Sequence, residues 1–257
     1  MVPFAQSIDG PSVMARLAKQ SLLLGIHGRA GIAVAVGERG HILLTNNQGK
    51  NWIQKKSPTR RTLNSVYLLD QKTIWIAGHQ STVLRSLDSG ESWTKIKVLN
   101  DPETSFLDLL FVDSRRGFIV GSYGKFFFTI DGGNTWTENK QEDDPHFYQI
   151  TTASNGLLWL IGEFGTVWKS NNQGNSWESL DIDYEGTLFG GVPLIKSESI
   201  IVHGLQGNIF RFKNGSIWEK IDSPTNAILH RGTQLKDGQL VFAAGAGELL
   251  LGSDKSR

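Results

Sequence analysis

The chain has 257 residues, among them 29 glycines and 8 tryptophans, a balance typical of short strands joined by glycine turns. Its formal net charge of +1 gives no electrostatic reason to expect nucleic-acid binding. Cysteine is missing, which excludes disulfides and thiolate metal sites, and no apolar run reaches the roughly 18 residues of a membrane-spanning helix.

The first residues, MVPFAQSIDG, lack the basic segment and apolar core of a secretory signal peptide. We expect residues 1–11 to form a flexible N-terminal segment of a single domain that covers residues 1–257. The following stretch, SVMARLAKQ at 12–20, precedes the first apolar strand, which is expected at Leu22–Ile26.

From this strand onward the sequence repeats itself with a period of about 42 residues. One marker is a tryptophan that recurs at intervals of 41, 43, 41 and 41 residues: Trp52, Trp93, Trp136, Trp177 and Trp218. The other marker is a glycine at the end of an apolar strand: Gly37, Gly78, Gly121, Gly162, Gly204 and Gly245. Two independent markers with one period indicate a repeat protein.

Residues 106–136 show the unit of this repeat. Apolar segments at 106–112, 118–120 and 125–130 predict three strands, and a fourth is expected to start at Trp136. Four short antiparallel strands per repeat make one propeller blade. The six marker glycines therefore predict an all-β, six-bladed β-propeller of four-stranded antiparallel blades.

The turn before each tryptophan has a recurring pattern, seen as SLDSGESW at 86–93 and TIDGGNTW at 129–136. Asparagine replaces the aspartate in TNNQGKNW at 45–52 and SNNQGNSW at 170–177, and a shortened copy is KNGSIW at 213–218. We expect the Asp or Asn oxygen to accept hydrogen bonds from the turn's own backbone N–H groups. Because the turn keeps its pattern without the charge, these aspartates are not expected to bind metal or to act in catalysis.

The sixth repeat stops after its third strand and lacks a fourth. Additional residues are present before the first repeat, so we expect Val13–Leu17 to pair with Glu248–Leu251. An N-terminal strand would then complete the last blade and remove exposed sheet edges.

Three lead-in segments, VGERGHILLT, VGSYGKFFFT and IGEFGTVWKS, together with the four clear turns, resemble the BNR/Asp-box propellers. The chain is most similar to the photosystem II assembly and stability factor type, over roughly residues 22–254. The resemblance implies a protein that binds partners, often membrane-protein subunits, on the extracytoplasmic or lumenal side. A periplasmic or other extracytoplasmic location follows from the resemblance alone.

In a propeller, the loops between strands 2 and 3 and the linkers between blades lie on one face. Titratable side chains of these loops are the candidate binding residues: Glu38, Arg39, Arg60, Arg61, His79, Tyr123, His146, Glu163, His230 and Arg231. The arginines suit an anionic peptide terminus or a small acid. His79, His146, Glu163 and Tyr123 are also candidates for acid–base catalysis. No histidine spacing indicates a metal site, and no cofactor is expected.

Three functions remain open. Regular blades and short loops favour a monomeric, non-enzymatic binding or assembly factor that presents a rigid face to a protein or peptide partner, including a membrane-protein subunit. The alternative is a hydrolase or lyase that uses the His, Glu, Arg and Tyr side chains, and a carbohydrate-binding lectin is the weaker third option. Sialidase activity is disfavoured because no Arg-Ile-Pro motif occurs.

Overall fold

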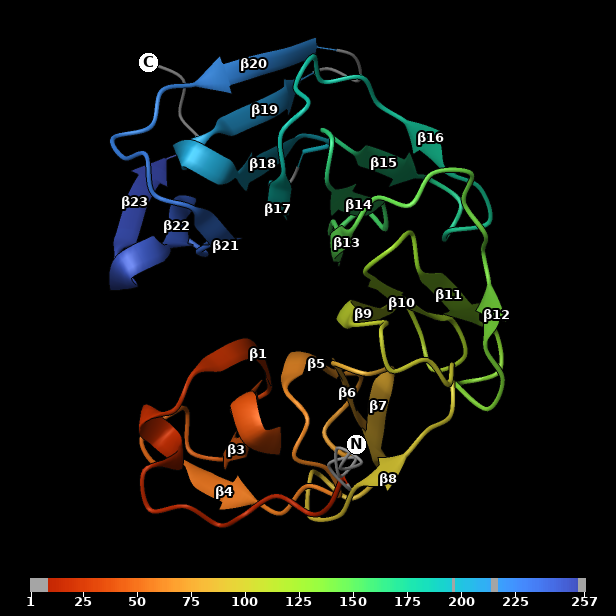
Figure 1. Cartoon of the computed structure of the whole chain (residues 1–257). Helices are drawn as coiled ribbons and strands as arrows, with labels where there is room; N and C mark the ends of the chain where they lie inside the picture. Colours follow the sequence, from red (N-terminus) through yellow and green to blue (C-terminus); the bar gives the residue numbers. More distant parts are fainter. Residues whose placement is uncertain (1–8, 196, 214–216, 254–257) are drawn as a thin grey trace, which may run out of the picture. The chain divides into compact units, whose positions relative to one another are not determined.

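The structure is a computed structural model that describes residues 9–195, 197–213 and 217–253. Within these residues it forms six consecutive antiparallel sheets, and the strands of each sheet lie side by side (Figure 1). The strand order in every sheet follows the chain, from the first strand of the repeat to the last. This arrangement confirms the predicted six-bladed β-propeller.

The first three blades contain strands β1 to β12. Blade 1 has β1 (Leu23–Arg29), β2 (Ile32–Gly37), β3 (Ile42–Thr45) and β4 (Ile53–Lys55). Blade 2 has β5 (Leu63–Leu68), β6 (Ile74–Gly78), β7 (Thr82–Ser86) and β8 (Thr94–Lys95). Blade 3 has β9 (Phe106–Phe111), β10 (Gly117–Gly121), β11 (Phe126–Thr129) and β12 (Thr137–Glu138).

The last three blades contain strands β13 to β23. Blade 4 has β13 (Phe147–Thr152), β14 (Leu158–Gly162), β15 (Val167–Ser170) and β16 (Glu178–Ser179). Blade 5 has β17 (Leu188–Pro193), β18 (Ile200–Gly204), β19 (Ile209–Lys213) and β20 (Ile217–Ile221). Blade 6 has β21 (Leu229–Gln234), β22 (Gln239–Ala244) and β23 (Leu249–Ser253). Short 3-10 turns are η1 (Ala18–Gln20), η2 (Glu38–Gly40), η3 (Leu205–Gly207) and η4 (Gly245–Gly247).

The chain divides into two compact units. Unit 1 comprises residues up to 119 together with 129–136, and unit 2 comprises 120–128 together with the residues from 137 onward. In unit 1 an apolar cluster that includes Val34, Leu63 and Ile76 joins blades 1 and 2. In unit 2 corresponding clusters join blade 4 to blade 5 and blade 5 to blade 6. Second strands such as β6 and β14 are buried along their whole length, which explains their unbroken apolar sequence.

The recurring turns have the predicted hydrogen bonds. The backbone N–H of Ser92 donates to Asp88 Oδ1 at 2.9 Å, and that of Ser176 donates to Asn172 Oδ1 at 3.0 Å. Asn and Asp therefore serve the same turn. Strong hydrogen bonding by Ser92 and Ser86 lowers the pKa of Asp88 to about 2. We refer to these turns as Asx turns.

In each blade, one residue of the loop between the second and third strands has a left-handed backbone conformation, always at the same position of the loop. We name this position the loop tip; it is Arg39, Gln80, Tyr123, Phe164, Gln206 and Ala246, with φ between 54° and 60°. A glycine follows the tip in most blades, as at Gly165, because a Cβ there would lie 1.8 Å from the Tyr184 carbonyl oxygen. The loop thus packs directly on the linker that leads to the next blade.

The predicted closure of the last blade is wrong within the described residues. The sixth sheet has three strands, and β23 pairs with β22 alone. Residues 13–17 form no strand; the Val13 carbonyl accepts a hydrogen bond from Gln54 Nε2 at 2.9 Å, and Ala15 N–H donates to Gln54 Oε1 at 2.8 Å. Ala18 is buried against Ala35 and Leu43 of blade 1. This N-terminal stretch therefore belongs to blade 1.

Candidate functional site

The loops and linkers that carry the predicted site residues lie side by side within each unit. In unit 1 the Ser81 N–H donates to the Thr104 carbonyl at 2.8 Å. In unit 2 the Gly124 N–H donates to the Pro145 carbonyl, and the Gly165 N–H to the Gly186 carbonyl, both at 2.9 Å. In blades 2, 3 and 4 the loop tip therefore lies next to the linker that follows the blade.

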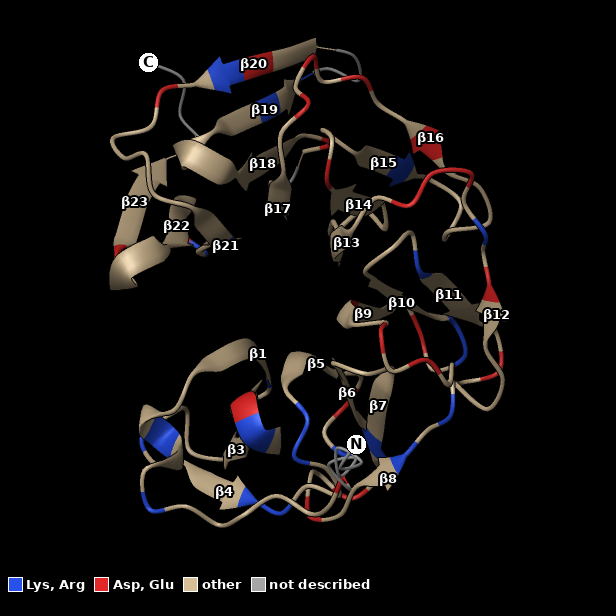
Figure 2. Cartoon of the chain, viewed as in Figure 1, with Lys and Arg blue, Asp and Glu red and all other residues tan. Residues whose placement is uncertain are grey.

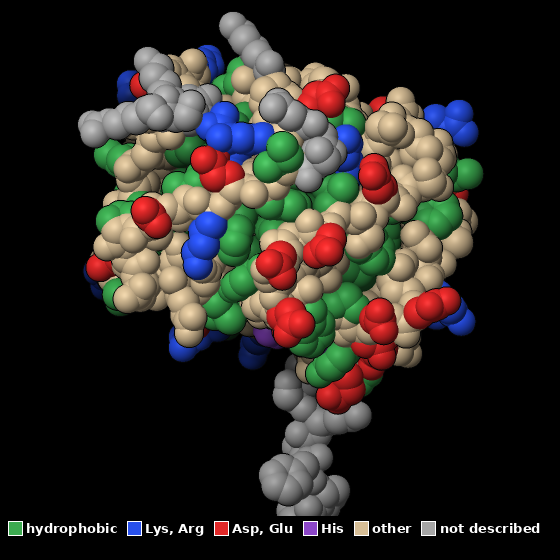
Figure 3. All heavy atoms as spheres, turned by 90° about the horizontal axis from the view of Figure 1, so that it is seen from above, with side chains coloured by type: hydrophobic (Ala, Val, Ile, Leu, Met, Phe, Trp, Pro, Cys, Tyr) green, Lys and Arg blue, Asp and Glu red, His purple; other side chains and the backbone are tan. Residues whose placement is uncertain are grey.

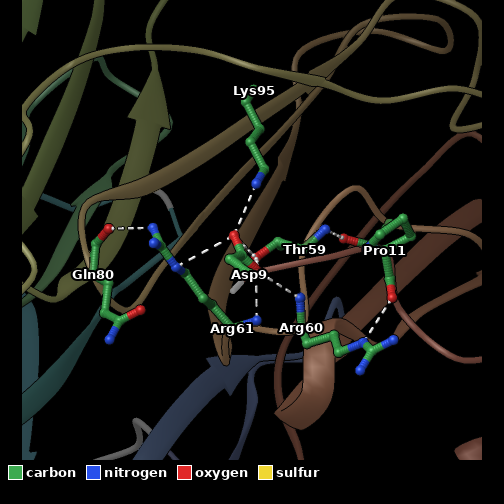
Figure 4. Close-up of polar contacts among 8 residues, drawn as sticks. Asp9, Pro11, Thr59, Arg60, Arg61, Gln80 and Lys95 are labelled. Atoms are coloured by element: carbon green, nitrogen blue, oxygen red, sulfur yellow. Dashed lines mark hydrogen bonds and ion pairs between the residues drawn. The ribbon is translucent and has the colours of Figure 1, made fainter. Parts of the chain in front are cut away.

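In unit 1, Arg60 and Arg61 contact Asp9 and Pro11 (Figure 4). The Asp9 carboxylate lies 3.4 Å from Arg61 Nε and accepts a hydrogen bond from the Arg60 backbone N–H at 3.0 Å. Arg60 Nε donates to the Pro11 carbonyl at 2.9 Å, and Arg61 Nη1 donates to the Gln80 carbonyl at 2.9 Å. Both arginines, predicted to bind a partner, therefore contact this chain's own N-terminal residues.

Two further groups complete the environment of Asp9. Lys95 Nζ lies 2.8 Å from the Asp9 carboxylate, and the Thr59 hydroxyl donates to it at 2.7 Å. Burial raises the pKa of Asp9, but the hydrogen bonds from Lys95, Thr59 and the Arg60 N–H outweigh this and lower it overall. Asp9 is therefore ionised at neutral pH.

The other predicted residues of unit 1 do not join this cluster. Glu38 Oε1 accepts a long hydrogen bond of 3.4 Å from the Leu22 N–H, and Arg39 and His79 are exposed. Glu38 and Arg39 therefore lie on the loop of blade 1 and His79 on the loop of blade 2, apart from this cluster. Arg60 and Arg61, on the linker between the two blades, are the candidates that the structure brings together.

In unit 2 the first strand of each blade has a β-bulge at its second residue. The pairing register shifts between Phe147 and Gln149, between Leu188 and Gly190, and between Leu229 and Arg231. The bulged residues are Tyr148, Phe189 and His230. A bulge interrupts the alternation of side chains between the two faces of the strand. Because the bulge lies at the same position in the three blades, these three rings share one orientation relative to their blades.

These bulged residues belong to a continuous row of rings, which we name the ring row. Its centroids follow one another at 4.9 Å (Tyr123 to His146), 6.2 Å (His146 to Tyr148), 4.8 Å (Tyr148 to Phe189) and 5.7 Å (Phe189 to His230). The first three contacts are edge-to-face and the fourth is tilted, and such contacts fix the rings relative to one another. The row combines three of the predicted residues, Tyr123, His146 and His230, with two that the sequence analysis did not select.

Glu163 lies beside the ring row. Its carboxylate accepts hydrogen bonds from the His146 backbone N–H at 2.9 Å and from the Tyr148 hydroxyl at 3.4 Å. Burial, followed by the negative charge of Glu163, raises the pKa of Tyr148 to about 12. Tyr148 is therefore held as a neutral hydrogen-bond donor, which is the opposite of an activated phenolate.

Tyr148 and Phe189 were missed because nothing marks a bulge in the sequence. One signal was available: Tyr148, Phe189 and His230 follow one another at the 41-residue interval of the repeat. Arg231, the residue after the bulge of blade 6, pairs with Ala243 in β22 and is half-buried.

In the described part of the chain, no group of three or more His, Asp or Glu side chains is arranged to hold a metal ion. Across the same residues, no helix has the length and apolar character needed to span a bilayer.

The profile of the family described as photosynthesis system II assembly factor YCF48 matches residues 98–248, more than half of the sequence. The chain belongs to this family. The matched region includes blades 4 and 5, the ring row and Glu163. No curated protein sequence matches the chain.

Solved structures of YCF48 have the same fold. A structure of YCF48 bound to a D1 peptide has 16% sequence identity and a TM-score of 0.69, covering 90% of this chain and 77% of that one. YCF48 from Cyanidioschyzon merolae has 17% identity and a TM-score of 0.69, covering 91% and 83%. Virginiamycin B lyase from Staphylococcus aureus has 11% identity and a TM-score of 0.73, covering 91% and 85%. At these identities the structural likeness concerns the fold.

Proposed function

We propose that this protein is a non-enzymatic assembly factor that holds an extended segment of a partner protein on the ring row of unit 2. The partner we propose is a membrane-protein subunit whose segment is exposed outside the bilayer, on the extracytoplasmic side. The observation that carries the proposal is the unbroken row of five rings, which blades 3 to 6 contribute in chain order.

Three properties of the ring row suit a polypeptide ligand. First, the rings are fixed by contacts with each other and by bulges, so little side-chain entropy is lost when a ligand packs on them. Second, aromatic and histidine rings offer both apolar surface and polar edges, a combination enriched in protein interfaces. Third, a row spread over several blades matches an extended chain better than a compact small molecule.

Membership of the YCF48 family and the D1 peptide bound by a YCF48 of the same fold support this proposal. The raised pKa of Tyr148, which keeps its hydroxyl protonated, favours binding over nucleophilic catalysis at this position.

The test is a peptide array that covers the extramembrane segments of the native host's membrane proteins. Wild-type protein is expected to bind a small set of segments, and a Tyr148→Ala, His230→Ala double variant is expected to lose them. A matched control is Asn64→Ala, a change at the bulged residue of blade 2 in unit 1. Equal binding by wild type and the double variant would contradict the proposal.

A further inference from the structure

The loop tips of the neighbouring blades 3 and 4, which both lie in unit 2, are aromatic residues. Tyr123 and Phe164 expose 54% and 72% of their surface, whereas the other four tips are Arg, Gln, Gln and Ala. Tyr123 starts the ring row, and Phe164 directly follows Glu163. Large exposed rings next to an ordered row of rings extend the apolar surface of the candidate site outward.

The linkers against which these two tips pack are acidic. Residues 139–146 lead into β13 and residues 180–187 lead into β17, and Figure 2 shows Asp and Glu along both. Buried Pro145 and Ile182 anchor them to the blades. The exposed carboxylates of the two linkers are Glu142, Asp143, Asp144, Asp181, Asp183 and Glu185, and the basic residue among them is Lys140.

Most of these carboxylates have no internal cation. Among the described residues, the side chains of Glu142, Asp143, Asp144 and Glu185 form no ion pair and no hydrogen bond. Unit 2 as a whole has 11 Lys and Arg against 15 Asp and Glu, a net charge of −4, whereas unit 1 has 15 against 10, a net charge of +5. Acidic and hydrophobic side chains lie next to one another at the lower right of the space-filling view (Figure 3).

From this combination we infer that the surface formed by Tyr123, Phe164 and the two acidic linkers binds a basic segment of the partner protein, rich in Arg or Lys with apolar residues between them. This inference rests on the proposed function and adds the chemistry of the ligand. Guanidinium and ammonium groups pack on the faces of exposed Tyr and Phe rings, and their charge is neutralised by nearby carboxylates.

The same charges argue against an acidic segment. A ligand carboxylate near Tyr123 would lie next to Asp143 and Asp144 and would be repelled by them, and no exposed cation of the two linkers other than Lys140 would compensate. A purely apolar segment would leave the linker carboxylates without a partner. Charge complementarity therefore selects the basic ligand.

The experiment uses the full chain and two fluorescein-labelled hexapeptides, one alternating Arg and Leu and the other alternating Glu and Leu. Fluorescence anisotropy at 50 mM and 500 mM NaCl gives the dissociation constants. We expect wild type to bind the Arg peptide at least about tenfold more tightly than the Glu peptide at low salt, with the difference shrinking at high salt because exposed charges are screened.

Three variants separate the contributions. Tyr123→Ala with Phe164→Ala is expected to weaken Arg-peptide binding about tenfold at both salt concentrations, because the cation loses its ring faces. Asp143→Asn with Asp144→Asn is expected to weaken it about fivefold at low salt and little at high salt. The control, Gln206→Ala, changes a loop tip of the same unit and is expected to leave binding unchanged.

Equal affinity for the two peptides, or wild-type affinity in the Tyr123 and Phe164 variant, overturns the inference. The proposed function fails separately, on the peptide array. If the array returns segments that depend on Tyr148 and His230 but carry no basic residues, the proposed function stands and this inference falls. If no array segment depends on Tyr148 and His230, the proposed function falls, and the hexapeptides still decide whether Tyr123 and Phe164 bind cations.

Discussion

The Asp9 carboxylate accepts a hydrogen bond of 2.7 Å from the hydroxyl of Thr59, a fully buried residue 50 positions further along the chain. Ser12 and Ser57 add a second pair of contacts, since the Ser12 N–H donates to the Ser57 carbonyl and the Ser57 N–H donates to Ser12 Oγ, both at 2.9 Å. Residues 9–12 are therefore fixed along the linker between blades 1 and 2, whereas residues 1–8 of the segment predicted to be flexible lie outside the described residues.

Replacing Asp9 with Asn is expected to lower the free energy of unfolding by about 1 kcal/mol at neutral pH, since Lys95 and Arg61 are partly exposed and solvent weakens their ion pairs. Because folding lowers the Asp9 pKa, this stabilisation is present above about pH 3.8 and is lost as the pH falls below it. Urea titrations from pH 3 to 7 measure the effect. A Glu103→Gln control, at an exposed carboxylate of the same unit, should change nothing; an identical pH profile for Asp9→Asn and wild type would contradict the prediction.

The Asx turn of blade 3 depends on a buried hydroxyl. Thr129 Oγ1 accepts hydrogen bonds from the backbone N–H groups of Gly133 at 2.9 Å and Asp131 at 3.3 Å. Thr129→Val keeps the shape but leaves these donors unpaired, and is expected to cost about 2 kcal/mol, or several degrees in Tm. Thr129→Ser, the residue that blades 2 and 4 use at Ser86 and Ser170, should stay close to wild type in a thermal melt. Equal melting temperatures for the two variants would show that the hydroxyl does not matter.

His203 makes stability depend on pH. It is fully buried, its Nδ1–H donates to the Leu229 carbonyl at 3.0 Å, and burial lowers its pKa from 6.5 to about 4. Because the folded state favours the neutral ring, the stabilisation is complete above pH 6.5 and is lost as the pH falls from 6.5 toward 4. The loss is expected to reach about 3 kcal/mol, since one pKa unit corresponds to about 1.4 kcal/mol. Guanidinium titrations should show a steeper loss of stability from pH 6.5 toward 4 in wild type than in His203→Asn; parallel profiles would exclude His203 as its source.

Phe164 is expected to lower the free energy of unfolding at its position. Its backbone is left-handed, with φ of 55°, and its ring is exposed. Phe164→Asn is expected to raise the free energy of unfolding by about 0.5–1 kcal/mol, because Asn tolerates this conformation, whereas the β-branched Phe164→Val should lower it by about 1 kcal/mol. Chemical denaturation of the three proteins measures both effects, and a destabilised Asn variant would mean that the ring contributes packing energy.

The repeat made most of the fold predictable from sequence. Trp93 and Trp177 mark the same turn in different blades, and the hydrogen bonds to Asp88 and Asn172 are those that the turn chemistry requires. The closure of the last blade was not predictable in this way, because it depends on whether residues 12–18 pack on blade 1 or pair with the last strand of blade 6. Specific hydrogen bonds with Gln54 and the burial of Ala18 decide for blade 1, and neither has a periodic pattern.

The candidate site was predictable in part. Tyr123, His146, Glu163 and His230 came from loop positions that the repeat defines, and the structure brings them together in unit 2. Tyr148 and Phe189 lie inside strands, where alternation alone does not reveal which side chains a bulge turns toward the site. The contact of Asp9 with Arg61 was equally hidden, since it joins distant parts of the sequence through a segment that was expected to be flexible.

At the loop tips, the backbone conformation that each blade needs for folding is independent of the side chain that the blade exposes. The backbone conformation of the tip is the same in all six blades, yet the tip side chain ranges from Ala246 to Phe164. A substitution at one tip therefore changes the surface that one blade contributes and leaves the surfaces of the neighbouring blades unchanged. The surface of this scaffold can therefore be changed blade by blade, with the stability cost confined to one left-handed residue at a time.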